Sequence, residues 1–362
     1  MMKEQFKMVR PASLEDNFAE SGKQEKPSDA EAMAGRRQEA GNLNNEIMRI
    51  QGGRNLEDLE VDELKKVLEL YNKIKSIGKR ETEAREGKID GPVEEQISRA
   101  REIMGDSEVM GINEVKSAFG IEVPESEVPP IPFSKTELER AKELNQFLVL
   151  RVDKAKDGNP LTMQKINESL SQDFKDESKG KILYDVDWYA EEPFYTGGED
   201  TEQTALKSEW ALTSKKIIED SNSKNYLEQS LEIAEYLERE VFLGIEMPDE
   251  YKEAISELKD KKEELAKLIE TNDRNKYEPE LSKLKINKLT RQSSVETLYD
   301  ILIYFQNNDE RLLEDKYAWT HTATSDGGRV GVGRFDSVGA RVGGFSDDYS
   351  PSGLGVVFSR NF

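Results

Sequence analysis

The sequence predicts an α+β fold in which helices come first and a set of short strands closes the chain. Three observations support this class. Apolar residues recur at helical spacing over several long segments between Leu56 and Phe305. A short apolar run at residues 147–152 is typical of a buried strand. After Trp319, short runs in which apolar residues alternate with glycine and polar residues replace the helical spacing, which indicates strands.

The composition is polar for a fully compact protein. The chain has 362 residues, enough for two ordinary domains or one domain with long additions. Charged residues make up 35% of it, and the mean hydropathy is -0.77. We therefore expect part of the chain to be disordered or elongated. Residues 1–52 sustain no apolar period, and we predict that they are disordered.

Charge, cysteine content and hydropathy exclude several classes of protein. The net charge is -22, so the chain repels phosphate backbones, and we expect no nucleic acid among its partners. The absence of cysteine excludes disulfides, zinc–thiolate sites, iron–sulfur clusters and cysteine nucleophiles. No apolar stretch resembles a secretory signal or approaches the length of a membrane span. By default we expect a cytoplasmic location.

Two helices and a proline-rich segment precede the predicted main domain. From Leu56 onward, apolar residues mark one helical face: Leu64, Val67, Leu68, Tyr71 and Ile74. A second helix begins after Gly91-Pro92 and carries Ile97 and Ile103. We interpret residues 53–120 as a helical spacer or as a segment that forms a homo-oligomer. The prolines of residues 121–134 predict a stiff linker.

Residues 135–362 form the predicted main domain. Ser134 and Glu137 have the spacing of a capping box that opens a helix. Further helices are expected over residues 161–170, 225–242, 248–271 and 295–305, and the last is the most apolar and should pack centrally. The region between residues 184 and 210 is rich in aromatics: Tyr184, Trp188, Tyr189, Phe194, Tyr195 and Trp210. This clustering indicates a core under long loops, and a ligand platform is the alternative.

The last 43 residues, Thr320 to Phe362, differ in composition from everything before them. All 33 Lys and all 50 Glu of the chain precede Thr320. The last 43 residues also lack Gln, Met and Trp, and 9 of them are Gly. Val330 and Val332 point to one face of a predicted strand and Arg329 and Gly331 to the other.

The missing residue types fit a pattern of directed mutation. When both adenines of an asparagine codon ending in a pyrimidine are randomised, the products never include Lys, Gln, Glu, Met or Trp. Every residue from Thr320 to Phe362 belongs to the types that remain. The alternative is that glycine-rich strands avoid long side chains anyway.

Several motifs resemble the C-terminus of the variable proteins of diversity-generating retroelements: Trp319-Thr320, Asp326-Gly327, Val332-Gly333-Arg334-Phe335-Asp336-Ser337 and Gly353-Leu354-Gly355-Val356-Val357-Phe358-Ser359-Arg360. The resemblance covers about residues 104–362. It implies a C-type-lectin fold of the formylglycine-generating-enzyme type, with added helices. It also implies a variable region at about residues 320–358 that an error-prone reverse transcriptase rewrites.

The resemblance divides the tail into a fixed frame and a hypervariable set. The frame residues are Val330, Val332, Phe335, Val342, Leu354, Val356, Phe358 and Arg360. The implied ligand-binding residues are His321, Gly328, Arg329, Gly331, Arg334, Val338, Ala340, Arg341, Gly343, Gly344, Phe345, Asp347, Asp348 and Tyr349. We expect Arg329, Arg334, Arg341, Phe345 and Tyr349 to be exposed and close together above the apolar frame.

The expected activity is binding without catalysis. Oxidation of the formylglycine type needs a cysteine pair and the iron-dependent relatives need several histidines, whereas this chain has no Cys and only His321. We therefore expect no enzyme, no catalytic residue, no cofactor and no metal. Calcium at Asp347-Asp348 or at Asp185 and Asp187 is the alternative.

We expect a ligand-binding display protein whose partner is an unknown protein or surface ligand. The alternative function is a structural or assembly protein, as a phage or cell-surface component, without diversified binding.

Overall fold

The computed structural model describes residues 89–198, 204–271 and 273–361, with scattered positions between residues 42 and 70. The chain divides into two compact units, Met1–Lys88 and Ile89–Phe362. In the first unit, four apolar side chains form a buried cluster: Ile47, Leu59, Val67 and Leu70. Ile47 lies in a helix, so the predicted disorder of residues 1–52 is wrong at this position. Residues 1–41, 44, 45, 48, 51 and 52 of that prediction lie outside the described residues, as do Leu64, Leu68, Tyr71 and Ile74 of the helical face.

The second unit begins well before the predicted domain boundary at residue 135. Helix α4 (Val93–Met104) follows Pro92 as predicted, and α5 (Ile112–Phe119) comes next. Both helices contribute side chains to the main hydrophobic core.

The proline-rich segment is packed against this unit and is not a linker, so that prediction is wrong. Val128, Ile131 and Phe133 are buried in the main core. The Ile131 backbone N–H donates to the Gln96 side chain at 2.7 Å, and the Trp210 indole donates to the Pro129 carbonyl at 2.8 Å. The prolines keep the backbone extended, but the apolar residues between them hold it on the core.

A four-stranded sheet forms one layer of the unit, in the order β1-β2-β3-β8. Its strands are β1 (Val109–Met110), β2 (Gln146–Arg151), β3 (Glu209–Ser214) and β8 (Ser359–Asn361). Strand β2 runs parallel to β1 and antiparallel to β3, and all six of its residues are buried. The apolar run at residues 147–152 thus forms the predicted buried strand. The structure brings the last strand of the chain into the same sheet, antiparallel to β3.

Capped helices surround this sheet. Helix α6 (Lys135–Glu143) starts with the predicted capping box, in which the Glu137 carboxylate accepts the Ser134 backbone N–H at 2.8 Å. Helix α7 (Met163–Asp176) starts where a helix was expected, and a short α8 (Pro193–Thr196) follows. The remaining short turns are 3₁₀ segments: η3 (Asp106–Glu108), η4 (Glu125–Glu127) and η5 (Glu219–Ser221).

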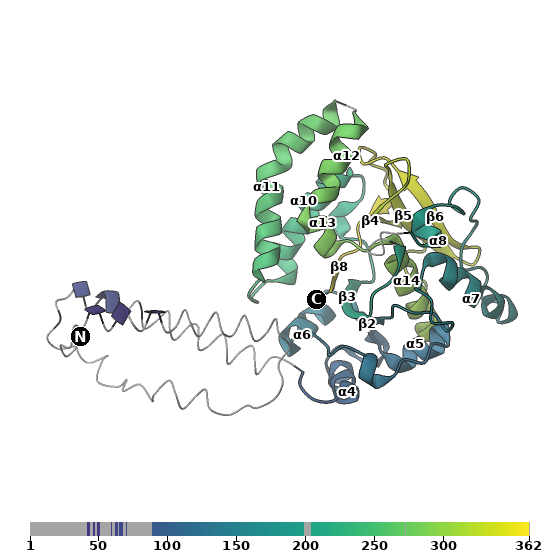
Figure 1. Cartoon of the computed structure of the whole chain (residues 1–362), viewed down its shortest axis with the longest axis horizontal. Coiled ribbons are helices and arrows are strands. Elements are labelled where there is room, and N and C mark those ends of the chain that lie inside the picture. The colour runs from purple at the N-terminus through teal and green to yellow at the C-terminus, as the bar shows by residue number, and fades with distance from the viewer. Residues whose placement is uncertain are drawn as a thin grey trace. The chain divides into compact units, whose positions relative to one another are not determined.

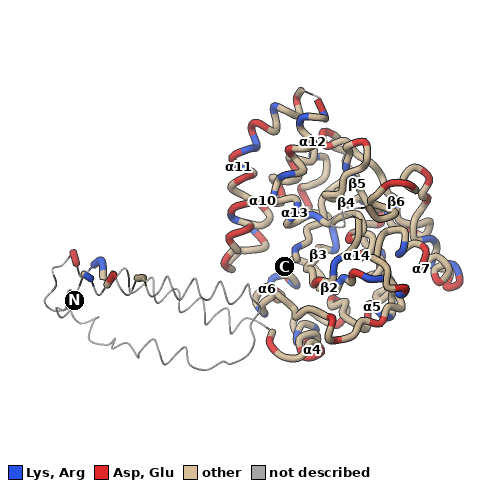
Figure 2. The backbone as a smooth tube through the Cα atoms, in the orientation of Figure 1, with Lys and Arg blue, Asp and Glu red and all other residues tan. Residues whose placement is uncertain are grey.

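Four helices gather beside the C-terminal strands and share a second hydrophobic core with them (Figure 1). They are α10 (Tyr226–Tyr236), which continues into the π-turn η6 (Leu237–Val241), α11 (Asp249–Glu270), α12 (Arg274–Lys283) and α13 (Lys285–Thr290). Acidic and basic segments follow one another along α11, as its sequence predicts for a solvated face (Figure 2). Helices α12 and α13 were not predicted from the sequence.

Helix α14 (Ser294–Asn308) is the central helix of the unit, as predicted. It packs against β2 and against the strands of the C-terminal sheet, and its residues 294–305 are buried except for Glu296. A capping box between Ser293 and Glu296 fixes its start. Its apolar surface extends around most of the helix, which is typical of a helix buried on all sides.

One arginine links β2 to α14 through a buried polar network. Arg151 is 1% exposed, and its guanidinium lies 2.8 Å from Asp300 Oδ2 and 2.9 Å from Glu296 Oε1. It also pairs with Glu209 at 3.1 Å and donates to the Ser359 hydroxyl at 3.0 Å. Burial disfavours the charged guanidinium, but the carboxylates outweigh it and raise the pKa of Arg151. The network therefore joins β2, β3, β8 and α14.

The C-terminal sheet has the order β6-β5-β4-β7. Its strands are β4 (Tyr317–Ala323), β5 (Arg329–Asp336), β6 (Gly339–Phe345) and β7 (Leu354–Gly355). All the predicted frame residues are buried: Val330, Val332, Phe335, Val342, Leu354, Val356, Phe358 and Arg360. Val356 and Phe358 face the second core while Val357 faces the first, so the end of the chain runs between the two cores.

None of the helices in the described part of the chain combines the length and the apolar composition needed to cross a bilayer.

Candidate binding surface

A bulge in strand β5 turns one arginine out of the C-terminal sheet. The register between β5 and β6 shifts between Gly333 and Asp336, and Arg334 within the bulge has a φ of 44°. This left-handed backbone is unfavourable for a residue with a side chain and costs about 1–2 kcal/mol. The Arg334 backbone N–H donates to the Lys316 carbonyl at 2.7 Å, which holds the bulge in place. The side chain is exposed, and its guanidinium lies 5.5 Å from the centre of the Tyr317 ring.

A second arginine lies near the same tyrosine. The Arg341 guanidinium sits 4.8 Å from the centre of the Tyr184 ring and 3.8 Å from the Asp336 carboxylate. Burial raises the pKa of the Tyr317 hydroxyl, while the positive charges of Arg334 and Arg341 act to lower it. Tyr317 and Arg341 pair with Gly333 from the two strands that flank β5, so the two side chains lie on the same face of the sheet.

Aromatic rings continue this surface along β6. Phe345 lies over two glycines that pair across the strands, Gly331 and Gly343. A Cβ at Gly331 would stand 2.6 Å from the Phe345 ring, so any side chain there would displace the ring. The Phe345 ring lies 5.5 Å from Tyr317 and stacks on Tyr349 at 6.2 Å. Tyr349 itself is 53% exposed.

Residues from well before the tail complete the surface. A Cβ at Gly180 would stand 1.9 Å from the Ser337 carbonyl oxygen, so only glycine permits the two backbones to approach this closely. The chain then pairs with the start of β6, and the Trp188 indole N–H donates to the Val342 carbonyl at 3.3 Å. Tyr184 and Trp188 remain 45% and 46% exposed.

We call the resulting set the aromatic–arginine patch. Its residues are Tyr184, Tyr317, Arg334, Arg341, Phe345 and Tyr349. Trp188 lies at the same edge of the sheet but against Gly344, on the face of β6 opposite to Phe345. Four residues of the patch were predicted as ligand-binding residues, Tyr317 was not, and Tyr184 was named only in the alternative of a ligand platform. In the sequence, Asp185 and Asp187 directly adjoin Tyr184 and Trp188, whereas the buried Tyr189 and Phe194 have no charged residue directly beside them.

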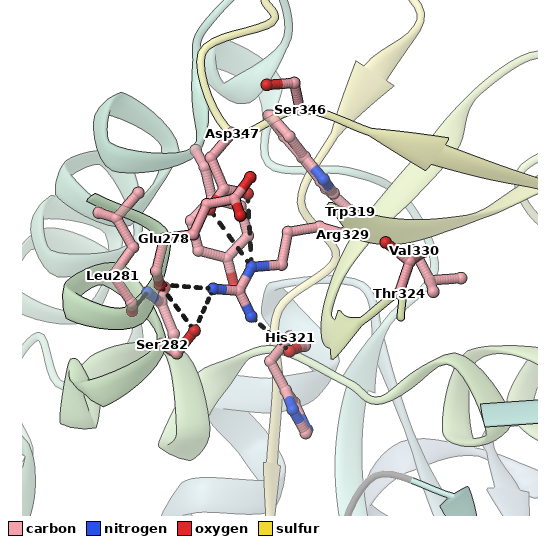
Figure 3. A network of polar contacts seen from close by, with 12 residues as sticks. Glu278, Leu281, Ser282, Trp319, His321, Thr324, Arg329, Val330, Ser346 and Asp347 are labelled. Atoms are coloured by element: carbon pink, nitrogen blue, oxygen red, sulfur yellow. Dashed lines mark hydrogen bonds and ion pairs between the residues drawn. The ribbon is translucent and has the colours of Figure 1, made fainter. Parts of the chain in front are cut away.

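The prediction that Arg329 is exposed is wrong. Arg329 is 3% exposed, and its Nε lies 3.3 Å from Asp347 Oδ1 (Figure 3). Its other nitrogens donate to the His321 carbonyl at 3.1 Å, to the Glu278 carbonyl at 3.2 Å and to the Ser282 hydroxyl. The face of β5 that carries Arg329 is covered by α12, so its donors are directed inward and satisfied within the chain.

Asp347 was predicted as a ligand-binding residue but is 0% exposed, so this prediction is also wrong. Burial raises the pKa of its carboxyl to about 6, against the attraction of Arg329. A second buried guanidinium, that of Arg291, lies 4.0 Å from the centre of the Tyr226 ring, and the Arg329 guanidinium lies 5.1 Å from the same centre. Asp347 therefore anchors the loop after β6 to the core.

Three other predicted ligand-binding residues are also buried, so the prediction is wrong for them. Gly328, Gly331 and Ala340 are buried by neighbouring backbone and side chains, so they do not form the outer surface. The remaining predicted residues are half-buried or exposed: His321, Arg334, Val338, Arg341, Gly343, Gly344, Phe345, Asp348 and Tyr349. Ligand binding by these residues stays a prediction.

The carboxylates considered for calcium do not assemble with other metal ligands. Among the described residues, no group of three or more His, Asp or Glu side chains could hold a metal ion. Asp347 is paired with Arg329, while Asp348 is exposed. The single histidine, His321, is half-buried, and burial lowers the pKa of its imidazole.

Substitutions in the exposed part of the patch should leave the fold intact. We expect Tyr349→Ala and Arg341→Ala each to change the free energy of unfolding by less than about 0.5 kcal/mol, as is usual at surface sites. Urea unfolding of each variant against the parent chain measures this. A loss above about 2 kcal/mol at either position would show that the residue is part of the core.

Comparisons with protein-family models, with curated proteins and with solved structures find no match to this chain.

Proposed function

We propose that this chain is a ligand-binding display protein whose exposed C-terminal residues are diversified by a retroelement. The observation that carries the proposal is the aromatic–arginine patch. Tyr, Trp and Arg are the residues that most often dominate the energy of protein interfaces, because they combine large contact area with hydrogen bonding. Here tyrosines and arginines gather where the C-terminal sheet is only partly covered: Val330 and Val332 bury one face in the main core, and the second core covers the other face as far as Trp319 and Arg329.

The patch combines residues from two parts of the chain. Tyr184 and Tyr317 precede Thr320, so they lie outside the segment with restricted composition. Arg334, Arg341, Phe345 and Tyr349 lie inside it. On this proposal, the first two residues are a constant rim and the last four vary between sibling proteins. The proposed partner is a protein surface, since rigid aromatic anchors beside adaptable polar residues suit recognition of other proteins.

The C-type-lectin fold is part of the same proposal. The α+β architecture, with two small sheets that share the last strands of the chain, supports it at the level of fold class. Diversification requires that the residues that stabilise the fold differ from those that vary, and the burial of the frame residues supports this separation. Side chains that set register and stability are inside, so substitution of exposed neighbours costs little.

The DNA around the gene tests this function. We expect a near-copy of codons 320–358 beside a reverse-transcriptase gene, with mismatches at adenines only. The structure adds a sharper expectation: the mismatches should include the codons of Arg334, Arg341 and Tyr349 and spare those of Arg329 and Asp347. If the flanking DNA holds no such repeat, or if its mismatches fall on the buried frame, the proposal fails and an assembly protein becomes the better reading.

A further inference from the structure

The four arginines of the tail fall into two kinds. Arg329 and Arg360 are each 3% exposed, and they pair with Asp347 at 3.3 Å and with Glu137 at 2.8 Å. Their positive charges are therefore neutralised by carboxylates within the protein. Arg334 is exposed and Arg341 is half-buried, and both lie against tyrosine rings at the surface.

Arg334 has a guanidinium that is positioned but not neutralised. Among the described residues, its guanidinium contacts the Tyr317 ring and has neither an ion pair nor a hydrogen-bond acceptor. Its place is fixed instead by the bulge, by its left-handed backbone and by the Tyr317 ring beneath it. Backbone strain of this kind is frequent where a side chain must be held in one direction for function.

Arg341 is paired only weakly. Its distance of 3.8 Å from Asp336 is near the limit for an ion pair, and both side chains are about one-third exposed, at 32% and 35%. Such pairs contribute little because water screens them. The Asp336 carboxylate also accepts the Val338 backbone N–H at 2.8 Å, which holds it in the β5–β6 turn. The Arg341 guanidinium therefore keeps donors for another acceptor.

We propose that Arg334, Arg341 and the Tyr317 hydroxyl form an anion subsite that accepts an Asp or Glu side chain from a partner protein. This inference rests on the proposed binding function and names the chemistry of one contact. Tyr317 and Arg341 flank Gly333 on neighbouring strands, and the Arg334 guanidinium lies 5.5 Å from the centre of the Tyr317 ring. The planar fork of an arginine matches the two oxygens of a carboxylate. Asp185 follows Tyr184, whose ring Arg341 contacts, so its carboxylate opposes the binding of an anion.

A single carboxylate fits this subsite better than a polyanion. The chain carries a net charge of -22, which repels molecules with many negative charges at long range. A protein side chain brings a single negative charge, which Arg334 can pair with directly, whereas Asp336 and Asp185 add to the repulsion of ligands with several charges. A phosphate group is the competing oxyanion, and the experiment separates the two.

Nuclear magnetic resonance of the arginine Nε–H groups in the full-length chain tests the subsite. The probe is the blocked tripeptide acetyl-Gly-Glu-Gly-amide, and its neutral match is acetyl-Gly-Gln-Gly-amide. We expect the Glu peptide to shift the Arg334 and Arg341 signals in a saturable manner and the Gln peptide to leave them in place. Arg334→Gln should weaken binding of the Glu peptide about tenfold, because it removes charged donors.

Two further variants sharpen the result. Asp185→Asn should strengthen binding of the Glu peptide several-fold, about as far as removal of one nearby like charge allows. Arg239→Gln is the matched control, since Arg239 is 73% exposed and pairs with Glu235 at 3.8 Å in the π-turn η6, outside the patch. It should leave the affinity unchanged.

Three results would overturn the proposal. They are equal shifts from the Gln peptide, unchanged affinity in Arg334→Gln, and an equal loss in Arg239→Gln. Tighter binding of inorganic phosphate than of the Glu peptide would replace the carboxylate with a phosphate as the ligand group. If the chain binds the Glu peptide saturably but its gene has no flanking repeat, the anion subsite stands and diversification is rejected. If the repeat is present but the peptide does not bind, diversification stands and the subsite is rejected.

Discussion

Replacing Arg329 with Met is expected to lower the free energy of unfolding by about 3–5 kcal/mol at pH 8. The substitution keeps much of the side-chain volume but removes the cation that faces Asp347, which is fully buried. An uncompensated carboxylate in this environment is costly because water cannot solvate it. The His321 carbonyl and the Ser282 hydroxyl would lose the hydrogen bond from Arg329 as well, whereas the Glu278 carbonyl would keep the one from the Ser282 hydroxyl. Urea unfolding followed by far-UV circular dichroism measures the loss.

A double variant separates charge from packing. Asp347→Asn added to Arg329→Met removes both charges at nearly constant volume, so it should recover more than half of the lost stability. Arg334→Met is the matched surface control and should cost less than about 0.5 kcal/mol. Equal losses for Arg329→Met and Arg334→Met would contradict the burial of Arg329.

The loss in Arg329→Met should depend on pH. Burial raises the pKa of Asp347 to about 6 in the folded chain, above the usual value of 3.8. A carboxyl with a raised folded-state pKa contributes stability below its unfolded pKa and loses it as the pH rises through the folded pKa. At pH 5 the Asp347 carboxyl carries a proton and needs no cation, so the variant should be closer to the parent chain there than at pH 8. A loss independent of pH between 5 and 8 would rule out Asp347 as its cause.

Local signals in the sequence predicted most of the elements correctly. Ser134 starts a helix as predicted, because its side-chain oxygen and the carboxylate of Glu137 satisfy the first backbone N–H groups. Asn225 and Ser293 start helices in the same way, although neither was named as a cap from the sequence. The apolar run at residues 147–152 forms a strand, and the apolar helix near residue 300 is central. These features depend on residues close together in the chain, which a sequence shows directly.

The sequence could not show which face of a strand is covered. Alternation separated Val330 and Val332 from Arg329 correctly, but it assigned the Arg329 face to solvent. Helix α12 covers that face, and its residues lie about fifty positions away in the chain. Asp347 was misplaced for the same reason. For Tyr184 and Trp188 the sequence favoured a core and left a ligand platform as the alternative, because pairing of residues 180–188 with β6 is also a long-range contact.

The proline-rich segment shows a related limit. Proline predicted an extended backbone, and the backbone around Pro124 and Pro129 is extended apart from one turn. The prediction of a linker was wrong because the side chains of Val128, Ile131 and Phe133 are packed in the main core. Whether an extended segment is free or packed depends on surfaces formed elsewhere in the chain.

Replacing Arg151 with Met is expected to have the largest effect of any single substitution in this protein, a loss above about 4 kcal/mol at pH 8. Arg151 is the one cation within ion-pair distance of Glu209, Glu296 and Asp300 in the described structure. Without it, three carboxylates would face one another in the core. Burial already raises the pKa values of Asp300 and Glu209 despite the attraction of Arg151.

Two measurements keep this last prediction open to contradiction even if Arg151→Met does not fold. Arg151→Lys keeps the charge but loses the planar fork that reaches several acceptors, so it should fold with an intermediate loss of stability. Protonation of Asp300 and Glu209, whose folded-state pKa values are raised, should reduce the loss in either variant as the pH falls toward 5. Arg239→Met, at an exposed arginine, should change stability by less than about 0.5 kcal/mol. An Arg151→Met protein as stable as the Arg239→Met protein at pH 8 would show that the network does not hold β2, β3, β8 and α14 together.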